Sequence, residues 1–234
     1  MLKKIVAING SPSAEKGNTE MLLAPFLRGM ENAGAETETL YVDKLNIKPC
    51  TCGRMYCWYN EPGKCCISDD MNMVYSKLQQ AEILVLATPV FIPLPGKMQD
   101  AINRLCPLLT PFIEFYNGRT RIKFRNDVSI QKIVLVATGD WWEKENLELV
   151  VHIAKEFADK SAVEFSGAVL RPHASRMKSQ GVLSEAGLSI QTATEKAGAD
   201  LIKTGFISGE LLDEISRPLI LEEDLRNRYN SFFK

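Results

Sequence analysis

The chain contains several runs of apolar residues that do not alternate with polar ones. The clearest runs are residues 4–8, 83–87 and 133–137, each rich in Val, Ile and Leu. A strand that is covered on both faces, as in a parallel sheet, has this continuous pattern. Two weaker candidates, residues 37–42 and 162–170, complete a set of five predicted strands.

Helical periodicity separates the predicted strands. Apolar residues recur three to four positions apart in four stretches, which is the spacing of an amphipathic helix. Strands that alternate with helices predict a doubly wound α/β sandwich. Five strands favour a flavodoxin-like parallel sheet in the order 2-1-3-4-5, with right-handed crossovers. The predicted helices cover residues 19–32, 69–80, 95–105 and 144–159.

Pro25 lies within the first of these predicted helices and conflicts with a regular helical geometry there. Within a helix, proline removes one backbone donor and crowds the preceding turn. We therefore expect the helix to bend near Met21, one turn before Pro25.

Two segments exceed this minimal plan. Residues 107–130 are expected to form an insertion whose basic run is either a solvated surface or a partner-facing one. Residues 172–234 are expected to form a helical extension, with one helix from Ser184 to Thr204. We therefore divide the chain into a flavodoxin-like domain, 1–171, and this extension, which packs on the same domain or on a neighbouring subunit.

Composition and charge exclude several classes of partner. The 28 Lys and Arg residues nearly balance the 29 Asp and Glu residues, so a nucleic-acid or anionic-membrane surface is not expected. No run approaches the roughly 20 apolar residues of a membrane span. The N-terminal apolar run is too short for a signal peptide, and we expect a cytoplasmic protein.

The turn between the first predicted strand and the first predicted helix is rich in Gly and Ser. Such a turn sets backbone amides and hydroxyls where an anion can bind, and the helix dipole adds about half a positive charge. The turn has neither the Gly-Lys-Ser/Thr ending of a Walker loop nor Gly-x-Gly-x-x-Gly, which disfavours ATP and dinucleotides. Neutral donors suit a terminal phosphomonoester; an ordinary helix cap is the alternative. These donors are Ser11, Ser13, Asn18 and Thr19.

The ends of the third and fourth predicted strands add flat, stiff surfaces. The third strand runs into a proline-rich loop, Thr88–Met98, that contains Phe91, and the fourth runs into Thr138–Trp142. In an open α/β sheet, ligands bind outside the carboxyl ends of the strands. The three strand ends together predict a site for a mononucleotide with a large planar group.

These motifs resemble those of the NADPH-dependent FMN reductase branch of the flavodoxin-like superfamily. The resemblance rests on Asn9–Pro12, Gly17–Thr19 and Thr88–Phe91. It implies bound FMN, NAD(P)H as co-substrate, and a quinone, flavin or other small molecule as electron acceptor. It implies that the phosphate is bound by Ser11, Ser13, Gly17, Asn18 and Thr19, and the isoalloxazine by Thr88, Pro89, Val90, Phe91, Ile92, Pro93, Thr138, Gly139 and Asp140.

The cysteines are distributed unevenly. Residues 46–71 hold five of the six and resemble the cysteine-bearing segment of iron–sulfur flavoprotein-like members of this branch. Cys106 stands apart in an apolar setting and is interpreted as a small buried hydrophobe. A [4Fe–4S] cluster, a zinc ion and no metal all remain open for the segment. The candidate metal ligands are Cys50, Cys52, Cys57 and Cys65, of which Cys52 is displaced from the usual spacing.

Two functions follow from these observations. The first is an FMN-dependent, NAD(P)H-dependent oxidoreductase; the alternative is an iron–sulfur flavoprotein that takes electrons from ferredoxin. A flavodoxin-like binding protein without turnover is a third class. The only histidines, His152 and His173, exclude a His-rich metal site, and the tail from Ile215 is the expected contact in a homo-oligomer.

Overall fold

A computed structural model describes residues 2–53 and 55–233 of the chain. Its centre is a five-stranded sheet in the order β2-β1-β3-β6-β7, and every neighbouring pair is parallel. In order along the chain this is 2-1-3-4-5, so the predicted flavodoxin-like topology is confirmed. The strands are β1 (Lys3–Asn9), β2 (Ala35–Tyr41), β3 (Ile83–Pro89), β6 (Lys132–Thr138) and β7 (Glu164–Arg171).

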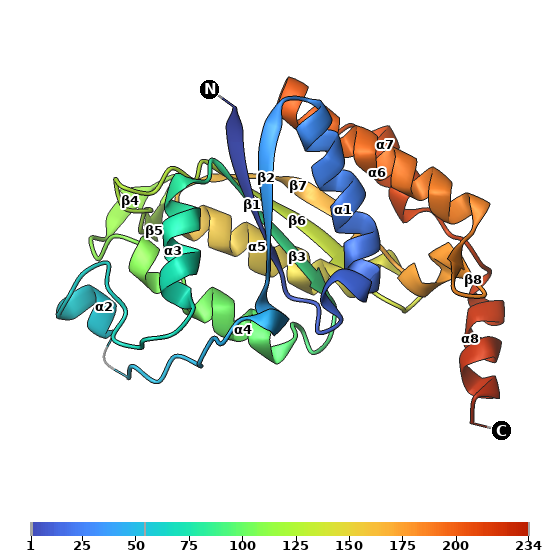
Figure 1. The fold of residues 1–234 in the computed structure, drawn as a ribbon, viewed down its shortest axis with the longest axis horizontal. Coiled ribbons are helices and arrows are strands. Elements are labelled where there is room, and N and C mark those ends of the chain that lie inside the picture. The colour runs from blue at the N-terminus through green and yellow to red at the C-terminus, as the bar shows by residue number, and fades with distance from the viewer. Residues whose placement is uncertain (1, 54, 234) are drawn as a thin grey trace.

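Helices cover both faces of this sheet (Figure 1). The four predicted helices are present, and the last of them begins with a 3₁₀ turn, η4 (Lys144–Leu147). One face carries α1 (Asn18–Asn32), α6 (Glu185–Thr204) and α7 (Gly209–Ser216). The other face carries α3 (Met71–Gln80), α4 (Gly96–Asn103) and α5 (Glu148–Lys160).

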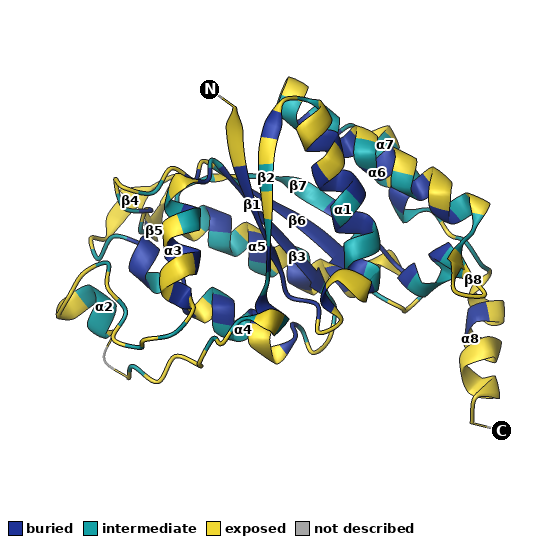
Figure 2. Ribbon diagram, viewed as in Figure 1, coloured by how far each residue is buried: buried dark blue, intermediate teal, exposed yellow. Residues whose placement is uncertain are grey.

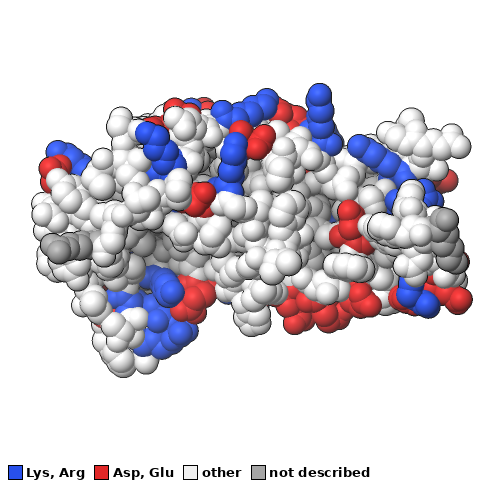
Figure 3. Space-filling view, turned by 90° about the horizontal axis from the view of Figure 1, so that it is seen from below, with Lys and Arg blue, Asp and Glu red and all other residues white. Residues whose placement is uncertain are grey.

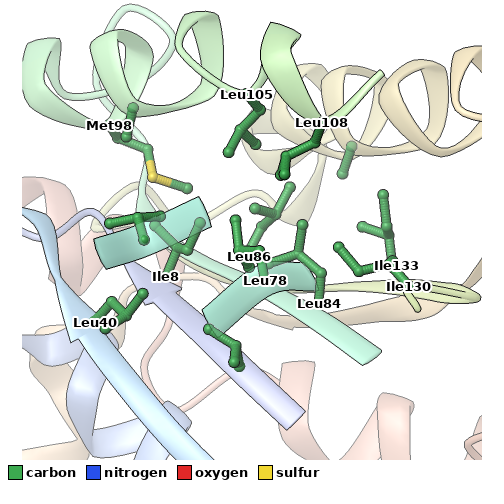
Figure 4. Close-up of a cluster of buried hydrophobic side chains, with 14 of the residues drawn as sticks. Ile8, Leu40, Leu78, Leu84, Leu86, Met98, Leu105, Leu108, Ile130 and Ile133 are labelled. Atoms are coloured by element: carbon green, nitrogen blue, oxygen red, sulfur yellow. The ribbon is translucent and has the colours of Figure 1, made fainter. Parts of the chain in front are cut away.

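The continuous apolar runs are explained by two cores, one on each face of the sheet. Successive strand residues point to opposite faces, so Ala7 joins the core under α1 while Ile8 joins the core under α4. Figure 2 shows the central strands buried along most of their length. Figure 4 shows Ile8, Leu84 and Leu86 beneath Met98 and Leu105.

Two glycines let α1 and α6 lie against each other. A Cβ atom on Gly29 would sit 1.8 Å from the Glu195 carbonyl oxygen. A Cβ atom on Gly198 would sit 1.9 Å from the Phe26 carbonyl oxygen. These distances are far below van der Waals contact, so the two helix backbones touch directly at this crossing.

The helix α1 continues through Pro25 without ending there. Proline leaves the carbonyl of the residue four positions earlier, Met21, without its usual helical partner. Gln191 of α6 fills this role, because its Nε2 donates to the Met21 oxygen at 2.9 Å. The conflict predicted from the sequence is thus compensated by a neighbouring helix.

The insertion at residues 107–130 is attached to α5. Its hairpin is formed by β4 (Glu114–Tyr116) and β5 (Arg119–Arg121). Arg119 donates to Asp159 of α5 at 3.0 Å, and the buried Arg121 hydrogen-bonds the same carboxylate. Neither of the two expected roles of the basic run, a solvated or a partner-facing surface, applies to Arg121, because its charge is neutralised within the chain.

The C-terminal helix α8 (Glu222–Ser231) leaves the body of the molecule (Figure 1). Within this helix Leu225 is buried, whereas Phe232 and Phe233 beyond it are exposed. Among the described residues, no helix is long and apolar enough to cross a membrane. The remaining elements are η1 (Ala14–Lys16), η2 (Val42–Lys44), α2 (Tyr56–Tyr59), η3 (Cys106–Leu108), η5 (Ala174–Met177), β8 (Lys178–Ser179) and β9 (Val182–Leu183).

Candidate functional site

A cavity of about 280 Å³ lies at the carboxyl ends of β1, β3 and β6. This is where ligands bind in open α/β sheets. The three loops singled out from the sequence meet here. The lining residues that were predicted are Ser11, Ser13, Asn18, Thr19, Pro89, Val90, Phe91, Thr138, Gly139 and Asp140.

The N-terminus of α1 opens into this cavity. Its N-cap is Gly17, and no side chain of the described residues caps it. By contrast, Ser184 caps α6 and Ser208 caps α7 through side-chain hydrogen bonds. The serines of the turn therefore do not act as an ordinary cap, and the first amides of α1 stay available to a ligand.

The turn is held in shape by close contacts among its own residues. A Cβ atom on Gly17 would lie 2.6 Å from the Ser11 hydroxyl oxygen, so any larger residue would displace that hydroxyl. The Ser11 Oγ accepts from the Ser13 amide at 3.3 Å. The Thr19 and Thr138 hydroxyls are buried 2.9 Å apart and join this turn to the end of β6.

A buried network supports the turn from behind. The Asn9 Oδ1 accepts from the Ser11 amide, while its Nδ2 donates to Glu20 at 2.9 Å. Tyr41 donates to the other oxygen of Glu20 at 3.1 Å. Burial raises the pKa of Glu20 above its ordinary value, against the lowering effect of these two hydrogen bonds. The sequence indicated Asn9 only as part of a motif, and nothing in it indicated that Glu20 and Tyr41 would support the turn.

The loop after β3 contributes backbone and ring surface. The Val90 amide donates to the Thr138 oxygen at 2.8 Å, which fixes this loop to β6. Thr88 is buried behind the lining and its hydroxyl donates to the Pro89 oxygen. Ile92 is fully exposed and precedes a cis peptide bond to Pro93. Thr88, Ile92 and Pro93, like Gly17, therefore stand beside the cavity rather than in its lining.

The loop after β6 contributes more of the wall than the sequence indicated. Two carboxylates, Asp140 and Glu143, border the cavity, and no Lys or Arg is among the described residues that line it. Figure 3 views the molecule from this side and shows Asp and Glu along its lower edge. The lining residues that were not among the predicted site residues are Pro12, Trp141, Glu143, Asn146, Leu147, Pro172 and Ala174.

Behind Pro172 and Ala174, Arg171 and His173 are fully buried. One Arg171 nitrogen donates to the His173 Nε2 at 2.6 Å, and another donates to the Ile215 oxygen at 2.6 Å. Burial, with the Arg171 charge, lowers the pKa of His173 to about 4, so this imidazole is neutral. His173 therefore ties the end of β7 to the segment after α7 and does not face the cavity.

A second site gathers all six cysteines. We call it the cysteine pocket. Five of the cysteines belong to the loop between Lys48 and Asp69, which we call the cysteine loop. Cys106 of η3 lies beside them and contacts Cys57. The interpretation of Cys106 as an isolated small hydrophobe missed this contact. Burial and the neighbouring Cys57 raise the pKa of Cys106 to about 12. The pocket is lined by Cys50, Cys52, Cys57, Cys65, Cys66, Asn103, Arg104, Cys106 and Pro107.

The two ends of the cysteine loop are clamped by one buried ion pair. Arg104 makes two hydrogen bonds to Asp69, at 2.7 and 3.0 Å, and both side chains are almost fully buried. Arg104 also donates to the oxygens of Lys48 and Ile67, which flank the loop. Burial opposes ionisation of Asp69, but hydrogen bonds from Arg104 and from the Lys48 and Met71 amides hold its pKa below the ordinary value.

The cysteine pocket does not have the geometry of a single-ion site. Among residues 2–53 and 55–233, no three Cys, His, Asp or Glu side chains converge closely enough to hold one metal ion. A tetrahedral zinc site needs this convergence, because each zinc–sulfur bond measures about 2.3 Å. The candidate ligands Cys50, Cys52, Cys57 and Cys65 share one pocket without enclosing a common point.

Comparison with protein families identifies a related family. The family described as NADPH-dependent FMN reductase matches residues 3–121, about half of the chain. The chain is 35% identical over 110 residues to an iron–sulfur flavoprotein of Methanocaldococcus jannaschii, a match that covers 47% of the chain and 55% of that protein. The chain thus spans about half the length of the curated relatives that it matches.

Solved structures share the fold. An NAD(P)H:quinone oxidoreductase of Methanothermobacter marburgensis superposes with a TM-score of 0.57 at 16% identity, covering 86% of this chain and 98% of that one. An FMN-dependent NADH-azoreductase of Bacillus anthracis, in complex with FMN, gives 0.58 at 11% identity, with 86% and 100% covered. At such low identities the likeness shows a common flavodoxin-like fold.

Proposed function

The chain belongs to the NADPH-dependent FMN reductase family, and from this premise we propose that it is an FMN-dependent oxidoreductase. NAD(P)H is the proposed hydride donor, and a quinone, a flavin or another small molecule is the proposed acceptor. The observation that carries the proposal is the cavity in which an uncapped helix start meets two aromatic loops. The names of both structural neighbours described above agree with it.

The donors at the α1 end of the cavity fit the phosphate of FMN. Ser11, Ser13 and Asn18 offer neutral hydroxyl and amide groups beside the helix start. Such groups bind a phosphate that stays in place and takes no part in the reaction. The positive end of the helix dipole supplies the attraction that Lys or Arg would otherwise supply.

The other end of the cavity fits a flat ring. Pro89, Val90 and Phe91 form one side, and Leu147 with Ala174 gives the inner wall an apolar surface. When bound there, FMN supplies the ring that accepts hydride and passes electrons on. The protein binds and orients this ring and limits the access of water to it.

The charge of the cavity bears on the acceptor. Asp140 and Glu143 place negative charge at the wall, and none of the described lining residues is a Lys or Arg. A neutral acceptor such as a quinone meets no repulsion there, whereas the phosphates of NAD(P)H would lie away from these two carboxylates. We therefore propose a neutral acceptor, such as a quinone.

Binding of FMN and oxidation of NAD(P)H test this proposal together. Ser13 is exposed, so Ser13→Ala should leave the fold intact. Losing one hydrogen bond to a charged phosphate costs roughly 1.5–3 kcal/mol, which weakens FMN binding about 10- to 100-fold. The matched control is Ser189→Ala on the outer face of α6, which should bind FMN as the unmodified protein does.

The proposal fails if the purified chain retains no flavin absorbance after FMN is added and unbound FMN is removed. It also fails if FMN-loaded protein oxidises neither NADH nor NADPH with any of several quinones and flavins present. Equal FMN affinity in the Ser13→Ala and Ser189→Ala variants would contradict the proposal that the phosphate binds at the α1 turn.

A second candidate is an iron–sulfur flavoprotein that exchanges electrons between FMN and a cluster, with ferredoxin as the redox partner. The cysteine pocket favours it, as do the curated relatives, which are named iron–sulfur flavoproteins. Iron and acid-labile sulfide in protein prepared without oxygen test this candidate. Absence of both from protein that binds FMN would leave the first proposal alone.

We also propose that the chain forms a homo-oligomer through its C-terminal segment. The expected contact began at Ile215, but this residue is buried in the core of its own chain. The exposed apolar surface begins at Leu221 and continues to Phe232 and Phe233. The Ile220 oxygen accepts from Trp142, so a truncation after this residue keeps that contact. The truncation should lower the number of chains per particle, as measured from the mass of the protein in solution. An unchanged mass would contradict this proposal.

A further inference from the structure

The cysteine pocket includes one thiol that lies far away in the sequence. Cys106 belongs to η3, at the end of α4, whereas the other five thiols belong to the loop between Lys48 and Asp69. We propose that Cys106 is a thiolate ligand of the iron–sulfur cluster that the second candidate function places in this pocket. This inference rests on the second candidate function proposed above.

The donor set fits a cluster better than a single ion. Six thiols line the pocket together with one amide side chain, and none of the described lining residues is a His, Asp or Glu. Thiolates are the usual ligands of iron–sulfur clusters. In a [4Fe–4S] cluster each thiolate binds a different iron atom, so the sulfur atoms need not converge on one point. The spread of the thiols, which does not suit a mononuclear zinc site, is compatible with this arrangement.

Cys106 lies on a fixed wall of the pocket. Its carbonyl oxygen accepts from the Trp58 ring nitrogen at 3.2 Å, which holds α2 against η3. The Tyr75 hydroxyl donates to the carbonyl of Arg104, two residues earlier, at 2.7 Å. The Cys106 thiol reaches Cys57 of the loop. The loop thiols therefore face a thiol whose backbone is already positioned.

Arg104 supplies a second, independent sign of a ligand. Its two terminal nitrogens are occupied by Asp69 and by the loop carbonyls. Its Nε, by contrast, is buried with no hydrogen-bond partner among the described residues, and Arg104 lines the cysteine pocket. A buried unpaired donor is unfavourable. A thiolate or cluster sulfur in this pocket would accept from it, and such hydrogen bonds tune metal–sulfur sites.

The Arg104–Asp69 ion pair, which we call the clamp, explains how the cysteine loop can take up a cluster while its two ends stay in place. The depression between the thiols measures about 20 Å³, so the interior of the loop would widen on loading. Cys50 and Cys66 are exposed and are not packed into the core. The Arg104–Asp69 pair meanwhile fixes both ends of the loop beside Cys106.

Anaerobic reconstitution of the full chain with ferrous iron and sulfide tests the inference. The unmodified protein should take up about four iron and four sulfide per chain, the content of a [4Fe–4S] cluster. Cys106→Ser should lose more than half of this iron and change the electron paramagnetic resonance spectrum of the reduced protein. The control is Ser189→Ala on the outer face of α6, which lies outside this pocket and should keep its iron.

FMN binding serves as the folding control, because the flavin cavity shares no lining residue with the cysteine pocket. Cys106→Ser should bind FMN as tightly as the unmodified protein. Full iron and sulfide in Cys106→Ser, with an unchanged spectrum, would overturn the inference while the cluster function stands. No iron in unmodified protein that binds FMN would overturn the cluster function itself, and this inference with it.

Discussion

The buried His173 makes the stability of this protein depend on pH in a predictable way. Folding removes this imidazole from water and sets it against the Arg171 charge, which lowers its pKa from 6.5 to about 4. In the unfolded chain the same side chain titrates near 6.5. Below that pH the unfolded state therefore binds a proton that the folded state does not.

The sign and size of the effect follow from this difference. Stabilisation by neutral His173 is complete above pH 6.5 and is lost as the pH falls from 6.5 toward 4. Each pH unit within this window changes the free energy of unfolding by about 1.4 kcal/mol. Between pH 6.5 and 5.0 the loss is roughly 2 kcal/mol, or roughly 4–8 °C in Tm for a chain of this size.

Thermal unfolding across this pH range measures the effect. His173→Gln removes the titrating group, so its Tm should change less between pH 6.5 and 5.0 than that of the unmodified protein. His152→Gln is the matched control, because His152 is the only other histidine and lies exposed on α5. If His173→Gln and the unmodified protein lose the same number of degrees, the protonation argument is refuted, whatever the stability of the variant at pH 7.

Two further predictions concern packing and the clamp. Gly198→Ala would place a Cβ atom 1.9 Å from the Phe26 oxygen and push α6 from α1, so we expect a loss of about 1–3 kcal/mol or more in urea unfolding; an unchanged midpoint would contradict the direct helix contact. Asp69→Asn leaves the Arg104 charge buried without its counter-ion and should cost about 3–5 kcal/mol. The control is Asp70→Asn, which alters an exposed neighbour whose side chain accepts from the Asn46 amide. An equal loss of unfolding free energy in the two variants would refute the role of the Arg104–Asp69 pair as a clamp.

The sheet and its helices could be predicted from the sequence because their signals are local. A run such as Ile83–Ala87 is apolar at every position only where both faces of a strand are covered, and the strand order follows from that class of fold. The flavin cavity was partly predictable for the same reason, since its loops follow directly from such strands. The short strands β4 and β5 gave no comparable signal, because three residues are too few to show a period.

Contacts between distant segments could not be predicted. Nothing near Cys106 indicates that α4 brings it to the cysteine loop, and nothing near Arg104 indicates that it holds both ends of that loop. Gln191 likewise reads as an ordinary helix residue, although it compensates Pro25 from the far end of the chain. Each of these roles depends on a partner tens of residues away, and single-residue patterns contain no information about it.

The contact between α1 and α6 has a consequence for the order of events during synthesis. The first α-helix, α1, finds its packing partner only in α6: Gly29 meets Glu195, and the Met21 carbonyl accepts from Gln191. A nascent chain that ends before residue 185 has α1 on this face of the sheet but lacks α6 and α7, which complete the apolar core there. The stretch that matches the family model, residues 3–121, lacks α6, so the core on this face is completed only after residues 185–204 have left the ribosome.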